Sequence, residues 1–78
     1  MVSVRLFAQA AELADTGQIN IDATSVDEIQ SQLVDRFGED FGQVLAESQI
    51  WVNGSSAVVE KTLEASDEVA VLPPVSGG

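Results

Sequence analysis

The residues best suited to chemistry lie at the C-terminal end of the sequence, in the segment Pro73-Pro74-Val75-Ser76-Gly77-Gly78. Each proline fixes its own φ angle, lacks an N–H donor and holds the residue before it extended. We therefore expect strand pairing to stop at Leu72 and a fairly stiff tail to follow. A carboxylate on Gly78 would have almost no steric cover. Six extended residues span roughly 20 Å, which is long enough to enter the active site of another protein.

A carboxylate is a poor electrophile, but an ATP-dependent partner could convert it into an acyl adenylate. A sulfur or nitrogen nucleophile could then attack the unbranched acyl carbon. The chain contains no cysteine or histidine and no glycine-rich phosphate loop, so it lacks the usual pairs of nucleophile and base. The sequence therefore predicts a carrier that reacts in the active sites of partners and is not an enzyme by itself. The alternative is an inert, frayed terminus.

The charge of the chain is strongly negative. Thirteen acidic residues stand against three basic ones, Arg5, Arg36 and Lys61, giving a formal net charge of -10 in 78 residues. Such a surface repels nucleic acid and anionic membranes and favours association with basic proteins. Solubility in a salty cytoplasm would explain it equally well. The acids are dispersed along the chain, so no metal site is expected.

The length predicts one domain, residues 1–72, followed by the tail at 73–78. Hydrophobic residues make up 45% of the chain, which argues for a folded globule. The longest apolar runs are far short of a spanning helix, and the N-terminus does not resemble a secretory signal. We expect a cytoplasmic protein.

Apolar residues alternate with other residues in 2–8 and again in 18–23, the period of half-buried strands. Between them, residues 10–14 could form a helical turn and 15–17 a turn, so the two strands should pair as an antiparallel hairpin. Ser25 and Glu28 have capping-box spacing before an amphipathic helix over 26–37, and Gly38 is placed to follow its end. Phe41, Val44 and Leu45 suggest a further helical turn.

The second half of the chain predicts a second hairpin and a final strand. Asn53-Gly54 is a strong turn signal between a strand at 50–52 and a strand at 57–59. Leu63 is expected to fill the core from a loop, and 69–72 to form the last strand. One main helix on a mixed sheet of four to five strands is a two-layer α+β domain, the β-grasp, in which the first and last strands would lie side by side.

The alternation also predicts which side chains face away from the helix. If Val2, Val4 and Leu6 face the core, Phe7 faces the open side of the sheet. Trp51 and Leu72 also face the open side if their neighbours in the predicted strands face the core. Large apolar residues gathered near the root of the tail suggest a protein interface.

Two stretches carry a family resemblance. Val4-Arg5-Leu6-Phe7-Ala8, with Glu12-Leu13 after it, and Asp67-Glu68-Val69 followed by the segment from Leu72 to Gly78 closely resemble the small subunit of molybdopterin synthase, the MoaD-type sulfur carriers. The likeness covers the whole chain. The ending is its most specific part.

The resemblance implies a ubiquitin-like β-grasp fold. It also implies that a ubiquitin-activating-like enzyme adenylates Gly78 with ATP and that a persulfide donor converts it into a thiocarboxylate. The large synthase subunit would then pass the sulfur to cyclic pyranopterin monophosphate and supply the catalytic residues, in a heterotetramer. Gly77 and Gly78 would be the reactive tail, residues 73–76 the channel segment, and Phe7 and Leu72 the contacts with partners. No cofactor is expected on this chain.

The sequence departs from the family at two positions. Ala11 stands where relatives often have arginine before a glutamate, which puts an ionic contact in doubt. Ser66 stands where they often have glycine, which puts the turn geometry in doubt. Three alternatives remain: a sulfur carrier for thiamine thiazole, a ubiquitin-like modifier that forms isopeptide bonds, and a passive interaction module.

Overall fold

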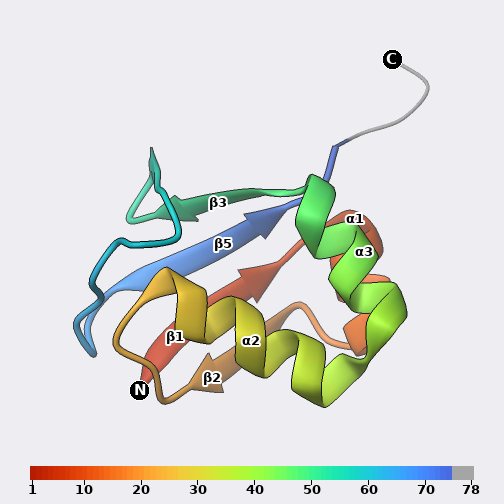
Figure 1. The fold of residues 1–78 in the computed structure, drawn as a ribbon, viewed down its shortest axis with the longest axis horizontal. Coiled ribbons are helices and arrows are strands. Elements are labelled where there is room, and N and C mark those ends of the chain that lie inside the picture. The colour runs from red at the N-terminus through yellow and green to blue at the C-terminus, as the bar shows by residue number, and fades with distance from the viewer. Residues whose placement is uncertain (75–78) are drawn as a thin grey trace.

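The computed structural model describes residues 1–74 as a five-stranded mixed sheet with helices packed on one side (Figure 1). The elements in chain order are β1 (Val2–Leu6), α1 (Ala8–Ala14), β2 (Gln18–Ile21), α2 (Val26–Phe37), α3 (Glu39–Glu47), β3 (Gln49–Val52), β4 (Ser55–Ser56) and β5 (Glu68–Leu72). The strand order is β2-β1-β5-β3-β4, in which β1 and β5 run parallel and the other neighbours antiparallel. The β-grasp prediction is confirmed, including the pairing of the first and last strands.

The first hairpin forms as expected, with Val2 opposite Ile21 and Val4 opposite Ile19. The prediction that β1 continues to Ala8 is wrong, because the strand ends at Leu6 and Ala8 begins α1 with a φ of 51°. That turn brings Ala10 into the core, where it is fully buried. A buried apolar contact can outweigh the local preference for continued alternation.

Helix α2 begins and ends where the sequence predicted. The Ser25 hydroxyl accepts a hydrogen bond from the Glu28 N–H at 3.2 Å. The Glu28 carboxylate accepts from the N–H of Thr24 at 2.9 Å, one residue earlier than in a standard capping box. The pKa of Glu28 is lowered, mainly by the hydrogen bond from the Thr24 hydroxyl and next by the one from the Thr24 N–H. Val26, Ile29 and Leu33 form the buried face of the helix.

A second helix follows directly after α2. Gly38, with a φ of 93°, ends α2 and precedes α3, which extends the expected single turn to nine residues. Phe41 of α3 is fully buried, and its ring centroid lies 5.1 Å from that of Phe37. This contact anchors α3 against the end of α2, so the sheet is covered by more than the one main helix predicted.

The second hairpin is shorter than predicted. Asn53 and Gly54 have φ angles of 51° and 84°, as a two-residue turn of this type requires. Residues 57–59 do not form a strand, because the chain leaves the sheet after β4 to cover the start of α2. There the carbonyls of Val59 and Lys61 accept hydrogen bonds from the N–H groups of Asp27 and Val26. These first-turn N–H groups have no partner inside their own helix.

The core lies between the sheet and the helices. Its side chains are almost entirely apolar, and Leu63 fills it from the long loop as predicted, with 4% of its surface exposed. The fully buried large residues are Phe41, Ile29, Leu33, Val2, Val4, Val26, Val69 and Val71. Within residues 1–74, no helix combines the length and the apolar character needed to cross a membrane.

Candidate functional site

The predicted tail begins at the end of the central strand β5. This strand is paired with β1 on one side and with β3 on the other, up to the pair of Leu72 and Gln49. Pairing stops at Leu72 as predicted, since the next two residues are prolines without N–H donors. Pro73 is buried and Pro74 exposed. The root of the tail is therefore held by hydrogen bonds on both sides of β5.

The sheet topology gathers other strand ends around this root. Because β1 is parallel to β5, its C-terminal end lies at the same edge of the sheet, and antiparallel β3 begins there (Figure 1). The predicted tail residues Val75, Ser76, Gly77 and Gly78 lie outside the residues that the structure describes.

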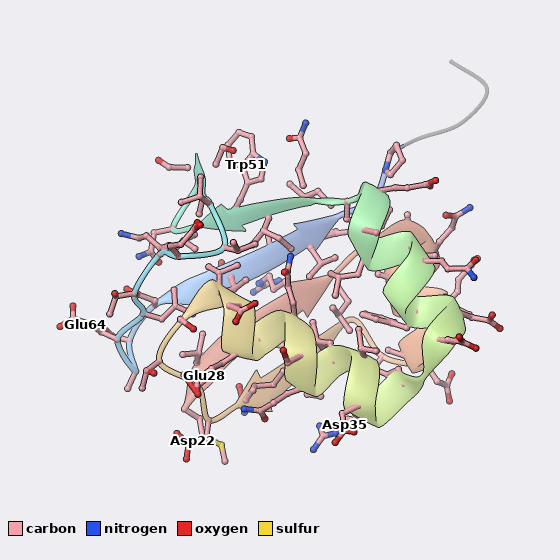
Figure 2. The ribbon with its side chains drawn as sticks, in the orientation of Figure 1. Asp22, Glu28, Asp35, Trp51 and Glu64 are labelled. Carbon is pink, nitrogen blue, oxygen red and sulfur yellow. The ribbon has the colours of Figure 1, made fainter. Side chains whose placement is uncertain are left out.

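The structure brings the three predicted interface residues to the open face of the sheet at or near this edge. Leu6 is opposite Val71, so Phe7 follows the end of β1 at the same edge of the sheet where Leu72 ends β5. Trp51 is opposite Ala70, on the same face as Leu72 and about 7–8 Å diagonally away. Phe7 is 43% exposed, whereas Trp51 and Leu72 are half-buried. Figure 2 shows Trp51 projecting from β3 away from α2, and its indole N–H donates to Gln49 Oε1 at 3.0 Å.

The remainder of the open face carries little net charge. Arg5 Nε lies 3.3 Å from Glu68 Oε2, and this exposed ion pair joins β1 to β5. Next to it, Gln18 Nε2 donates to Ser3 Oγ at 2.8 Å. Sequence reasoning missed the ion pair because it depends on the register of two strands that are distant in the chain. The face is suited to apolar contact with limited charge desolvation.

A small hollow of about 280 Å³ lies beside the root of the tail. Its lining comes from the end of α3, the start of β3 and the end of β5: Glu47, Gln49, Leu72, Pro73 and Pro74. The sequence contained no signal for this hollow, since three separate elements form it.

A polar clasp positions the beginning of β5. Asn53 Nδ2 donates to Asp67 Oδ1 at 3.0 Å, and Asn53 Oδ1 accepts from the Glu68 N–H at 3.0 Å. Asp67 Oδ2 also accepts from the Glu64 N–H at 2.9 Å. The pKa of Asp67 is lowered, mainly by the hydrogen bond from the Glu64 N–H and next by the one from Asn53. The clasp fixes the turn before the strand that leads to the tail.

The two departures from the family pattern have simple structural settings. Ala11 is half-buried on α1 and packs against the core. Ser66 lies in the turn from Glu64 to Asp67, closed by a bond from the Asp67 N–H to the Glu64 carbonyl. Ser66 is not among the residues with positive φ. The turn therefore does not require glycine at this position.

Comparison with known proteins gives a family and several relatives. The model of the ThiS family matches residues 4–78. The small archaeal modifier protein 1 of Haloferax volcanii is 32% identical over 85 residues, covering 95% of this chain and 97% of that protein.

Two solved structures add to the comparison. A putative molybdopterin converting factor subunit 1 of Pyrococcus furiosus is 27% identical and superposes with a TM-score of 0.84, covering 95% of this chain and 97% of that one. A complex of subunits 1 and 2 of the molybdopterin-converting factor of Helicobacter pylori contains a chain that is 26% identical, with a TM-score of 0.74 and coverage of 99% and 97%. The family match and these whole-length likenesses, together with the fold, show that the chain belongs to the ThiS family of ubiquitin-like β-grasp sulfur carriers and modifiers.

Proposed function

We propose that this protein is the sulfur-carrying small subunit of a molybdopterin synthase, with Gly78 as the group that carries sulfur. The observation that carries the proposal is a Pro-Pro-Val-Ser-Gly-Gly ending attached to a central strand with apolar residues around its root. A central strand gives the tail a rigid base. Phe7, Trp51 and Leu72 offer a surface on which a partner could dock while it receives the tail.

The chemistry proceeds in three steps on partner proteins. A ubiquitin-activating-like adenylyltransferase uses ATP to form an acyl adenylate on the Gly78 carboxylate and releases pyrophosphate. The terminal sulfur of a persulfide donor then attacks the acyl carbon and displaces AMP, which leaves an acyl disulfide. A second thiol on a partner protein cleaves the S–S bond, is itself oxidised to a disulfide with the donor cysteine, and leaves a thiocarboxylate on Gly78. In the large synthase subunit, the sulfur passes to cyclic pyranopterin monophosphate and Gly78 returns to a carboxylate. This chain supplies no cofactor of its own, and its reactions take place in the cytoplasm.

The likeness to subunit 1 of molybdopterin converting factors supports this choice among the sulfur carriers of the family. The complex of subunits 1 and 2 from Helicobacter pylori supports a larger subunit as partner. We further propose a heterotetramer of two carriers around a dimer of large subunits. Light scattering on the mixed subunits tests the stoichiometry, and a complex with a single carrier would contradict it.

A second candidate is protein modification. The whole-length likeness to small archaeal modifier protein 1 favours it, because the same acyl adenylate can react with a lysine amine and form an isopeptide bond. The two functions differ only in the nucleophile. A third reading, sulfur transfer to thiamine thiazole, has less support, because such carriers tend to be shorter and usually lack the proline pair.

The deciding experiment is the intact mass of the chain after incubation with ATP, an activating enzyme of this family and a sulfur donor. Replacement of one oxygen by sulfur is expected in the full chain and absent from a control chain that lacks Gly78. The added mass should disappear when cyclic pyranopterin monophosphate and the large subunit are supplied. If the enzyme modifies another carrier but not this one, the sulfur-carrier proposal is wrong. Isopeptide bonds between Gly78 and lysine amines of other proteins would support the protein-modifier function instead.

A further inference from the structure

A second hollow lies on the helical side of the molecule, away from the open face of the sheet. It has a volume of about 530 Å³ and runs between α2 and α3. Its lining residues are Asp27, Gln30, Ser31, Val34, Asp35, Gly42, Leu45 and Ala46. The proposed sulfur chemistry makes no use of it.

The floor of this groove is apolar and open. The side chain of Val34 is 37% exposed, although the core-facing residues of the same helix are fully buried. Gly42 lies opposite it, and a methyl group added at Gly42 would contact Val34 Cγ2 at 3.4 Å. Glycine in a helix interior costs about 1 kcal/mol relative to alanine. Here its absent side chain keeps the space above Val34 free.

The surroundings of the groove are acidic. Residues 26–47 contain one basic residue, Arg36, and six acidic ones: Asp27, Glu28, Asp35, Glu39, Asp40 and Glu47. Asp27 and Asp35 line the groove itself. Among residues 1–74, the structure has one ion pair, between Arg5 and Glu68 on the other side of the sheet. Neither aspartate that lines the groove therefore has a cationic partner within those residues. Figure 2 shows Asp35 on α2, far from Trp51.

We propose that the groove between α2 and α3 binds an amphipathic helix of a partner protein, with an aliphatic residue between two basic ones. The aliphatic side chain would contact Val34 and Leu45 above Gly42, and the cations would lie against Asp27 and Asp35. Helices commonly bind to grooves between helices in this manner. The two aspartates are eight residues apart on α2, or about 12 Å along its axis. A partner helix with the sequence Lys-x-x-x-Leu-x-x-x-Lys has its two lysines at the same spacing, and it can lie parallel or antiparallel to α2.

Charge complementarity selects this occupant over others. A second copy of the chain has the same net charge of -10 and would be repelled, as would nucleic acid or an anionic membrane. On the open sheet face, by contrast, Arg5 and Glu68 neutralise each other in an ion pair. The groove is therefore a separate surface, and its occupation goes beyond the proposed sulfur transfer.

The test is a titration of the full-length, 15N-labelled chain with an alanine-based helical peptide that contains Lys-x-x-x-Leu-x-x-x-Lys. Saturable amide shifts are expected at Ser31, Val34, Gly42 and Ala46, with none at Trp51 or Ala70. A peptide with glutamate in place of both lysines should not bind. Affinity for the lysine peptide should fall at 1 M salt, where the screening length is about 3 Å.

Variants separate the groove from the general acidity of the surface. Ala46→Arg places a cation at the exposed edge of the groove and should weaken binding at least about tenfold. Asp35→Asn should weaken it by a few fold, whereas the control Glu64→Gln, with the same change in net charge far from α3, should have no effect. Gly42→Ala should weaken binding although it raises helix propensity, so unfolding would not explain its loss.

Four results would overturn the proposal, three of them from the peptide titration. Those three are the absence of saturable shifts with the lysine peptide, shifts centred on the open sheet face, and equal effects of Asp35→Asn and Glu64→Gln. Self-association of the unbound chain through the groove, seen by light scattering and abolished by Ala46→Arg, would also overturn it. Sulfur loading of Gly78 is measured separately, so failure here leaves the proposed function unaffected.

Discussion

The two exposed sides of this small domain differ in charge and in shape. The open face of the sheet carries Phe7, Trp51 and Leu72 beside one closed ion pair, whereas the helical side carries a groove with an acidic rim. One thin core supports both. The net charge of the chain therefore says little about either surface alone, since the fold places six acidic residues on α2 and α3 and leaves the sheet face nearly neutral.

The largest expected effect comes from the contact that holds the helical side together. Phe41→Ala should lower the free energy of unfolding by about 3–5 kcal/mol, because it removes a fully buried ring that packs on Phe37. Phe7→Ala is the matched control, since Phe7 is 43% exposed and its removal should change stability little. Urea denaturation of both variants measures the difference. Equal losses would mean that Phe7 also supports the core.

The next effect concerns the open face and its partners. If the proposed function holds, Leu72→Asp should weaken binding of the large subunit or of the activating enzyme by about 2–4 kcal/mol, because a charge would replace an apolar side chain at the root of the tail. Ala46→Arg, on the helical side, is the control and should leave this affinity unchanged. Calorimetric titration of both variants gives the comparison. If both weakened binding equally, the two faces would not act separately.

A smaller effect is expected from the polar clasp at the beginning of β5. Asn53→Ala removes two side-chain hydrogen bonds, to Asp67 and from Glu68, and places alanine at a φ of 51°. We expect a loss of about 1–3 kcal/mol in unfolding free energy. Asn20→Ala, an exposed change on β2, serves as control. Thermal denaturation should separate them, and a normal midpoint for Asn53→Ala would exclude a structural role for the clasp.

The smallest effect is a dependence of stability on acid. The folded-state pKa of Asp67 lies below its ordinary value of 3.8, because the Glu64 N–H and Asn53 bond its carboxylate. Such a group stabilises the fold above the unfolded-state pKa, and the contribution is lost as pH falls through the folded-state value. Denaturant titrations from pH 5 downward should show a shallower decline in Asp67→Asn. The same decline in both proteins would contradict the prediction.

Much of the fold could be predicted because its signals are local. The alternation in 2–6, the cap at Ser25, the glycine after α2, the turn at Asn53-Gly54 and the stop at Leu72 each depend on neighbouring residues, and each is present in the structure. The strand predicted at 57–59 does not form, because the conformation of this segment depends on contacts with distant residues. Its β-branched residues suit a strand, but carbonyls in this loop bond the first N–H groups of α2, which are distant in the sequence.

The sequence by itself determined most of the elements and their buried faces, and it led to the proposed chemistry of the tail, because side-chain periodicity, proline geometry and the bareness of glycine act over a few residues. Only the tertiary structure decided which strands are neighbours, that β1 and β5 end at the same edge, that Arg5 pairs with Glu68, and that a groove remains between α2 and α3. These features depend on register and helix packing, which set distances between residues far apart in the chain.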